Sequence, residues 1–162
     1  MNKKMNKKIE KELLSLWGKV GFIVNLSQMV EYNFANILAL DEILREFEKT
    51  DSLFVFEYNE FAEHANTWYK RLSKMTFGAN FKRAKEIKFF TKESEEFLLK
   101  AIEKRNYVIH NLFKDDLIKN YLETNPKYYF NELEETISLL NTINESLVEI
   151  FNQQKEEYKL IW

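Results

Sequence analysis

Cysteine is absent from this chain of 162 residues, and proline and glycine are scarce. One proline and three glycines are far below average usage, so the chain has few positions suited to tight turns. The absence of cysteine excludes disulfides and thiolate metal sites. Because long helices need few turn residues, the composition predicts an all-α fold, an elongated helical bundle of four to five main helices.

The length and the hydrophobic content fit a single domain spanning residues 1–162, since 45% hydrophobic residues can bury a core. The basic residues 1–7 are expected to be disordered, and no apolar run typical of a signal peptide follows them. No run of about 18 uncharged apolar residues is present, so a membrane span is not predicted. We expect a cytoplasmic protein.

Periodic apolar positions predict the order of the helices. A long first helix is expected from about Lys8 to Phe47, with Gly18 and Gly21 allowing either a close helix contact or a kink. Further helices are predicted at Tyr58–Lys74, from an N-cap at Thr91 to about Phe113, at Asp115–Glu123 and at Tyr128–Tyr158, with a shorter helix or turn at Ala79–Phe90. The last of these repeats apolar residues at near-heptad steps, which indicates a seam within a bundle or a dimer.

Basic residues are concentrated between Lys70 and Lys92. This segment contains eight basic residues and one acid, Glu86, although the formal net charge of the chain is −2. Such a segment can hold a nucleic-acid backbone without reading its sequence. The residues that we expect to contact RNA are Lys74, Lys82, Arg83, Lys85 and Lys88. The alternative is an ordinary solvated helix surface.

Arg105 falls in the middle of an apolar helical stripe, where the pattern calls for an aliphatic residue. Glu31 is a second charge inside an apolar stripe, on the first helix, and a buried charge needs a partner. We therefore predict that Glu31 pairs with Arg105. Asn106 and His110 are four residues apart and should flank the arginine.

The residues Arg105, Asn106 and His110 suit metal-free chemistry at a phosphate. The sequence has no glycine-rich phosphate loop, nucleophile elbow or pair of histidines at metal spacing, so no cofactor or metal site is predicted. A histidine can transfer protons and an arginine can neutralise phosphoryl charge, while RNA carries its own nucleophile in the 2′-hydroxyl. A symmetric dimer would supply a second His110. The alternative is that Arg105 only forms a buried pair with Glu31.

The stretch Arg105-Asn106-Tyr107-Val108-Ile109-His110 resembles the signature of the HEPN superfamily, an Arg and a His separated by four to six residues with a polar residue after the Arg. The resemblance implies a homodimer with metal-independent endoribonuclease activity on RNA that leaves a cyclic phosphate. Arg105 and His110 would be catalytic and Asn106 would support them. The resemblance also implies a role in toxin–antitoxin or antiphage defence systems, with an antitoxin or defence protein as partner. Some members are non-catalytic binding or scaffold modules, which is the alternative function.

Overall fold

The computed structural model describes residues 3–49, 58–112, 114 and 126–161. Within these ranges the chain forms five α-helices and one π-helical turn, and no strand. The elements are α1 (Lys3–Lys49), α2 (Tyr58–Leu72), α3 (Phe77–Glu86), α4 (Lys92–Asn106), the π-turn η1 (Tyr107–Asn111) and α6 (Pro126–Ile161). The all-α prediction is confirmed.

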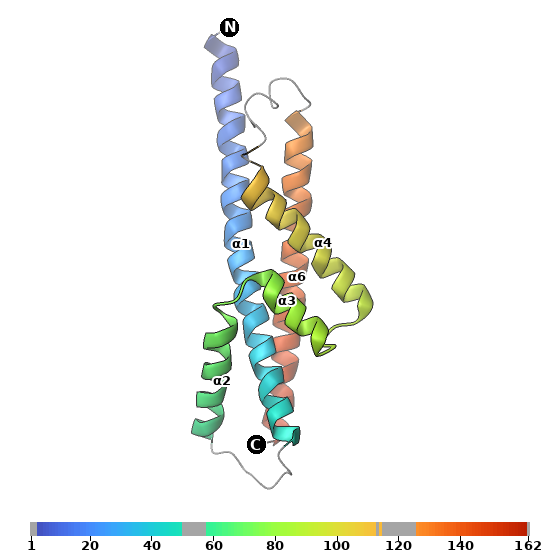
Figure 1. Ribbon diagram of the computed structural model, residues 1–162. Helices are drawn as coiled ribbons and strands as arrows, with labels where there is room; N and C mark the ends of the chain where they lie inside the picture. Colours follow the sequence, from blue (N-terminus) through green and yellow to red (C-terminus); the bar gives the residue numbers. More distant parts are fainter. Residues whose placement is uncertain (1–2, 50–57, 113, 115–125, 162) are drawn as a thin grey trace.

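Helices α1 and α6 lie side by side and run in the same direction along the length of the molecule (Figure 1). The two helices contact each other through buried residues that repeat every seven positions on each helix. On α1 these are Leu16, Ile23, Val30 and Ile37, and on α6 they are Leu133, Leu140 and Leu147. The near-heptad pattern of the last helix is thus explained by a seam inside the chain.

Polar residues fix the register of this seam. Asn33 Nδ2 donates to Asn144 Oδ1 at 2.8 Å, and Gln154 Nε2 donates to the carbonyl of Ile37 at 3.0 Å. Each bond joins one helix to the other. A shift of one helix along the other would therefore leave these amide groups without their partners.

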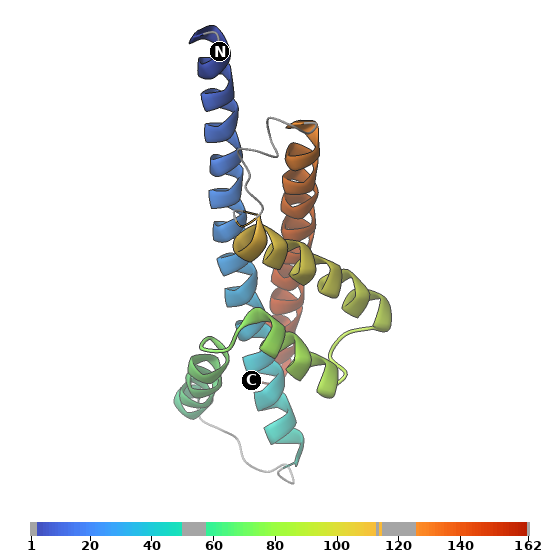
Figure 2. The same cartoon turned by 45° about the horizontal axis from the view of Figure 1, so that its top comes forward.

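The three shorter helices cover the two long ones. Helix α2 runs antiparallel to the C-terminal half of α1, and α3 and α4 cross the long pair obliquely (Figures 1 and 2). The side chains of Thr76 and Thr91 cap α3 and α4 by accepting hydrogen bonds from Ala79 N at 3.2 Å and Ser94 N at 3.3 Å. The N-cap predicted at Thr91 is therefore confirmed.

Several predicted boundaries differ from those in the structure. The first helix begins at Lys3, so residues 3–7 of the expected disordered segment are helical. Helix α3 ends at Glu86, because the chain turns at Lys88 with a φ of 54°. The motif helix changes to a π-turn after Asn106. The helix expected at Asp115–Glu123 lies outside the described residues.

Gly18 and Gly21 lie on an uninterrupted stretch of α1, and a Cβ atom built on either would meet nothing within 4 Å. Neither glycine allows a close contact with another described helix. Each nevertheless destabilises the helix by roughly 0.5–1 kcal/mol relative to alanine. Nothing in the described part of the chain requires a glycine at these positions.

Helix α1 contains a stretch, within residues Lys7–Glu46, that by length and composition is apolar enough to cross a membrane. Val20–Leu40 carries one charge, Glu31. Of the most apolar 18 residues of this helix 39% are buried inside the structure, and the core helix of a soluble protein can have the same length and composition. The absence of a membrane partner stays a prediction.

Candidate functional site

Arg105 lies in the last turn of α4, where this helix reaches α1, and it forms the ion pair predicted from the sequence. Its Nη2 donates to Glu31 Oε1 at 2.8 Å. The side chain of Arg105 is 18% exposed and that of Glu31 is 30% exposed. The pair is therefore half-buried, which strengthens it relative to a surface pair but leaves one edge accessible to a ligand.

The guanidinium of Arg105 is incompletely satisfied. Its Nη1 donates to Asn106 Oδ1 at 3.0 Å, whereas its Nε is buried without a hydrogen-bond partner among the described residues. Because Asn106 accepts with its carbonyl oxygen, its exposed amide NH2 remains available as a donor. Arg105 and Asn106 together present several N–H groups at one edge of the helix.

The turn that follows is wider than an α-helical turn. The amide of Leu112 donates to the carbonyl of Tyr107 at 2.9 Å, a bond that spans five residues. On a regular α-helix residues five apart, such as Arg105 and His110, point about 140° away from each other. A π-turn contains one more residue per turn, so the angle between residues five apart is smaller than in an α-helix. Such turns are frequent at functional sites.

This π-turn corrects the sequence prediction of a regular α-helix as far as Phe113. Val108, within the turn, and Leu112, directly after it, are both buried. The apolar residues of this segment therefore remain packed in the core although the hydrogen bonding of the helix changes.

The imidazole of His110 is exposed and forms no hydrogen bond or ion pair with another described residue. A histidine in this state can accept or donate a proton toward a molecule outside the chain. Arg105, Asn106 and His110, with Glu31 behind the arginine, form a cluster that we call the half-site. The structure brings all four predicted residues to one end of α4.

Lys104 holds the opposite flank of the same helical turn against α6. Its Nζ donates to Glu135 Oε2 at 2.8 Å and to Glu132 Oε2 at 2.9 Å, and Lys100 Nζ lies 3.0 Å from Glu135 Oε1. Hydrogen bonding to Glu135 raises the pKa of Lys104, and hydrogen bonds from Lys104 and Lys100 lower the pKa of Glu135. The helix that carries Arg105 is therefore tied to both long helices.

This cluster was missed in the sequence. Its signal is present there, since Lys100 and Lys104 are four residues apart and Glu132 and Glu135 are three apart, which are the spacings of neighbours on one helix face. Nothing in the sequence, however, indicates that these two faces meet.

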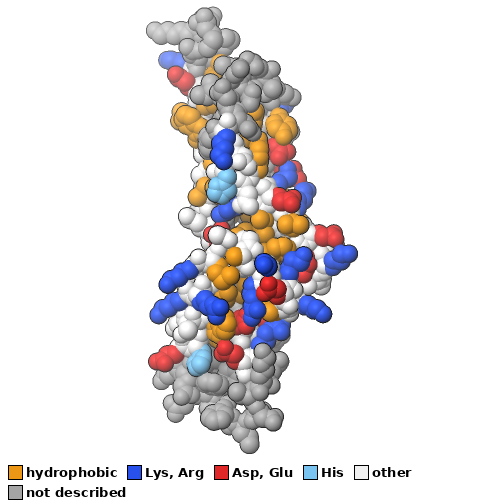
Figure 3. All heavy atoms as spheres, viewed as in Figure 1, with side chains coloured by type: hydrophobic (Ala, Val, Ile, Leu, Met, Phe, Trp, Pro, Cys, Tyr) orange, Lys and Arg blue, Asp and Glu red, His pale blue; other side chains and the backbone are white. Residues whose placement is uncertain are grey.

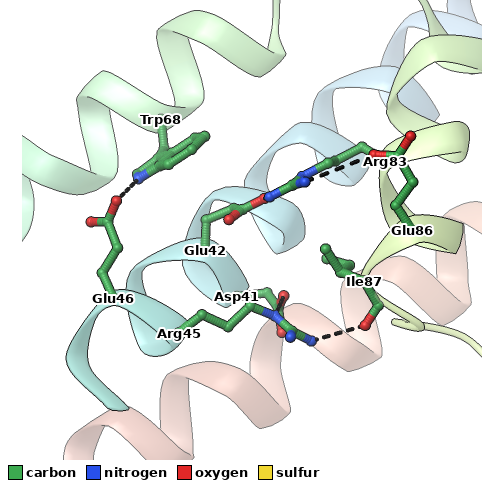
Figure 4. A network of polar contacts seen from close by, with 8 residues as sticks. All are labelled: Asp41, Glu42, Arg45, Glu46, Trp68, Arg83, Glu86 and Ile87. Atoms are coloured by element: carbon green, nitrogen blue, oxygen red, sulfur yellow. Dashed lines mark hydrogen bonds and ion pairs between the residues drawn. The ribbon is translucent and has the colours of Figure 1, made fainter. Parts of the chain in front are cut away.

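The basic residues predicted to contact RNA divide into two groups. Arg83 is bonded to the buried carboxylate of Glu42, with its Nε 2.5 Å from Oε1, and lies 3.8 Å from Glu86 (Figure 4). Lys85 Nζ lies 3.5 Å from Glu95. These two side chains join α3 to α1 and to α4.

Lys74, Lys82 and Lys88 are exposed, and none forms an ion pair with a described residue. Lysine and arginine side chains gather with interleaved acids over the lower half of the face in Figure 3. The local excess of positive charge is thus smaller in the fold than in the sequence, because α1 and α4 bring carboxylates to it.

The hollows described next lie away from Arg105. One is a groove of about 340 Å³ between α4 and α6, and its lining includes Phe97, Leu98 and Leu147. Another lies beside α2 and includes His64, whose Nδ1 is 3.8 Å from Glu46 Oε2, and Trp68, whose Nε1 donates to Glu46 at 3.1 Å. Among the described residues no group of three or more His, Asp or Glu side chains could hold a metal ion.

Comparison with models of protein families, with curated proteins and with solved structures finds no match to this chain.

Proposed function

We propose that the protein is a metal-independent endoribonuclease of the HEPN type that acts as a homodimer. The observation that carries the proposal is the half-site, in which a half-buried Glu31 holds Arg105 at one edge of a π-turn that displays His110. A charged group kept in an apolar stripe and followed by an exposed histidine on the next turn supports a phosphate ligand over a purely structural pair.

The reaction needs few groups, because the 2′-oxygen of RNA lies next to the phosphorus that it attacks. His110 of one copy takes the proton of the 2′-hydroxyl as the bond from that oxygen to phosphorus forms. The bond to the 5′-oxygen breaks, and the second copy's His110 gives that oxygen a proton. Arg105 neutralises the charge that develops on the non-bridging oxygens, and the amide of Asn106 donates to one of them. The products are a 2′,3′-cyclic phosphate and a 5′-hydroxyl.

Lys74, Lys82 and Lys88 are the residues that we propose to contact the RNA backbone on either side of the cleaved bond. They are exposed and have no ion pair with a described residue, whereas Arg83 and Lys85 are occupied by carboxylates. The contacts would be to phosphates and independent of sequence. We place the protein in the cytoplasm, in a toxin–antitoxin or antiphage defence system with a neutralising or activating partner protein.

The test is cleavage of a single-stranded RNA, labelled at both ends, by the purified protein in excess chelator. We expect His110→Ala to abolish cleavage and to leave the circular dichroism spectrum unchanged, since the side chain is exposed. His64→Ala is the matched control, because it removes the other histidine of the chain and should cleave as the wild type does. Cleavage that survives His110→Ala, or that needs a divalent metal, would contradict the proposal.

The alternative is a non-catalytic binding or scaffold protein of the same type. The hydrogen bond from Arg105 to Glu31 favours it, because this carboxylate already offsets the charge of the guanidinium. In that case the wild type would bind RNA or a nucleotide in a filter-binding assay without cleaving it, and His110→Ala would change nothing.

A further inference from the structure

One face of the N-terminal half of α1 is apolar, exposed and free of charge. Six large hydrophobic side chains on this helix are between 36% and 62% exposed. They are Leu14, Trp17, Phe22, Val24, Met29 and Tyr32. We call this surface, from residue 14 to residue 32 of α1, the α1 face.

No charged residue interrupts the α1 face. Its remaining exposed positions are Ser15, Gly18, Gly21, Asn25 and Gln28. The two charges in this stretch of sequence point elsewhere, because Lys19 binds Glu134 on α6 and Glu31 binds Arg105 on α4. In a chain with 31% charged residues, an exposed band without a single charge is unusual and is typical of an interaction surface.

The two glycines of α1 lie on this face and have no role within the described chain. A Cβ atom on either would meet nothing within 4 Å, and both lower the stability of the helix relative to alanine. Glycines in a helix interior permit a close approach of another backbone. Figures 1 and 2 show the other helices on one side of this half of α1 and none on the opposite side. A backbone that approached these glycines would therefore come from outside the described chain.

We propose that the occupant of the α1 face is a second copy of this chain, with the two α1 helices crossing at Gly18 and Gly21. A surface without charge is complementary to itself, since pairing it across a two-fold axis opposes no like charges and leaves no ion without a partner. Asn25 and Gln28 can hydrogen-bond their counterparts across the same contact. A lipid bilayer fits less well, because amide side chains are interleaved with the apolar ones and the opposite side of the helix is already packed against α6.

The size of the contact connects it to the half-site. A helix face of this length, about 27 Å, covers roughly 300 Å², whereas a stable interface needs about 800 Å² from each partner. Neighbouring elements must contribute the rest: α4 reaches the edge of the α1 face through the pair of Arg105 with Glu31, and η1, which also contacts α1, follows directly after it. This inference rests on the proposed function in one respect only, namely that the dimer brings two half-sites together.

The test is the oligomeric state of the full chain, measured by sedimentation velocity over roughly 1 to 100 µM protein. We expect the wild type to dimerise. Gly18→Ala combined with Gly21→Ala should weaken the dimer about tenfold although alanine favours the helix. Gly78→Ala is the matched control, since this glycine also lies in a helix with open space around it and should leave the dimer unchanged.

A second pair of variants tests the face with a charge. Val24→Lys should abolish dimerisation, whereas Val148→Lys, at a comparably exposed valine of α6, should not. A monomeric wild type, a dimer that survives Val24→Lys, or a monomer that sediments with phosphatidylcholine vesicles would overturn the inference. RNA cleavage is measured separately, so that a protein that cleaves through His110 but does not use the α1 face refutes this surface alone.

Discussion

Helix α1 forms two carboxylate–arginine pairs. In each, a glutamate of α1 binds an arginine of a shorter helix, but the surroundings of the two pairs differ. Glu31 and Glu42 are eleven residues apart, which places them on the same side of an α-helix about 16 Å from each other. Glu31 binds Arg105 from α4, and Glu42 binds Arg83 from α3. Both pairs fasten a crossing helix to the same long helix.

The two pairs differ in how completely they are satisfied. Glu42 is 5% exposed and accepts from two nitrogens of Arg83, and Glu86 lies near the same guanidinium. Arg105 gives Glu31 a single hydrogen bond, its Nε is buried without a partner among the described residues, and an exposed histidine follows on a π-turn. A fully bonded pair is explained by stability alone. The other pair leaves a guanidinium nitrogen without a described partner and is followed by an exposed histidine, which stability alone does not explain, and we therefore propose function there.

The largest difference between the two pairs should appear in activity. Arg105→Ala removes the group that offsets phosphoryl charge, so RNA cleavage should fall by about a thousandfold. Arg83→Ala should leave the cleavage rate per folded molecule unchanged, because this side chain is committed to Glu42. The measurement is initial cleavage rate, corrected for the folded fraction by circular dichroism. Equal losses in the two variants would show that the comparison fails.

For the free energy of unfolding we expect the larger effect from the Arg83 variant and the smaller one from the Arg105 variant. Arg83→Ala leaves the buried Glu42 carboxylate without its partner and should lower the free energy of unfolding by about 2 kcal/mol, less than for a fully buried pair because Arg83 is itself partly exposed. Arg105→Ala should cost less, since Glu31 can turn to solvent. Urea denaturation of both variants at the same pH measures this. A larger loss for Arg105→Ala would favour the structural alternative.

Glu31→Gln keeps the shape of the side chain and removes its charge. The amide can still accept from Arg105, so we expect a stability loss of about 1 kcal/mol and a decrease in cleavage of about tenfold through a less well held guanidinium. Glu95→Gln, on the Lys85 pair, is the control for the loss of a partly buried carboxylate charge away from the half-site. If Glu31→Gln raised the cleavage rate, Glu31 would be a competitor of the RNA phosphate and not a support for Arg105.

The smallest effect should come from the lysine that ties α4 to α6. The pKa of Glu135 is lowered, so its part of the bond stabilises the fold above the ordinary pKa of about 4.5 and is lost as the pH falls through the lower folded value. The pKa of Lys104 is raised, so its part is present below about 10.5 and is lost as the pH rises past the folded value.

Lys104→Met should therefore lower the melting temperature by a nearly constant amount between these limits, and the difference from the wild type should shrink outside them. Thermal unfolding at several pH values measures this, with Lys114→Met as a control at an exposed lysine. A difference that grows at acid pH would mean that Glu135 is not the partner that matters.

The helical pattern gave the fold class and the existence of each described helix, but not all of their ends. Apolar periodicity reports which residues face inward, and it placed Arg105 and Glu31 inside two stripes where only a pair could be tolerated. It does not report where a helix changes its hydrogen bonding, so the π-turn after Asn106 was missed. It also gave no sign that Arg83 and Lys85 would be occupied by Glu42 and Glu95, because those acids are remote in sequence.

The sequence by itself determined that this protein is all-helical, that Arg105 needs Glu31, and that His110 is the histidine near them. These follow from local spacing and from the cost of burying an unpaired charge. The tertiary structure alone decided which basic residues stay exposed, where the motif helix changes to a π-turn, and that no described helix covers the apolar face of α1. Those depend on which helices cross, and crossing is set by the packing of side chains that are distant along the chain.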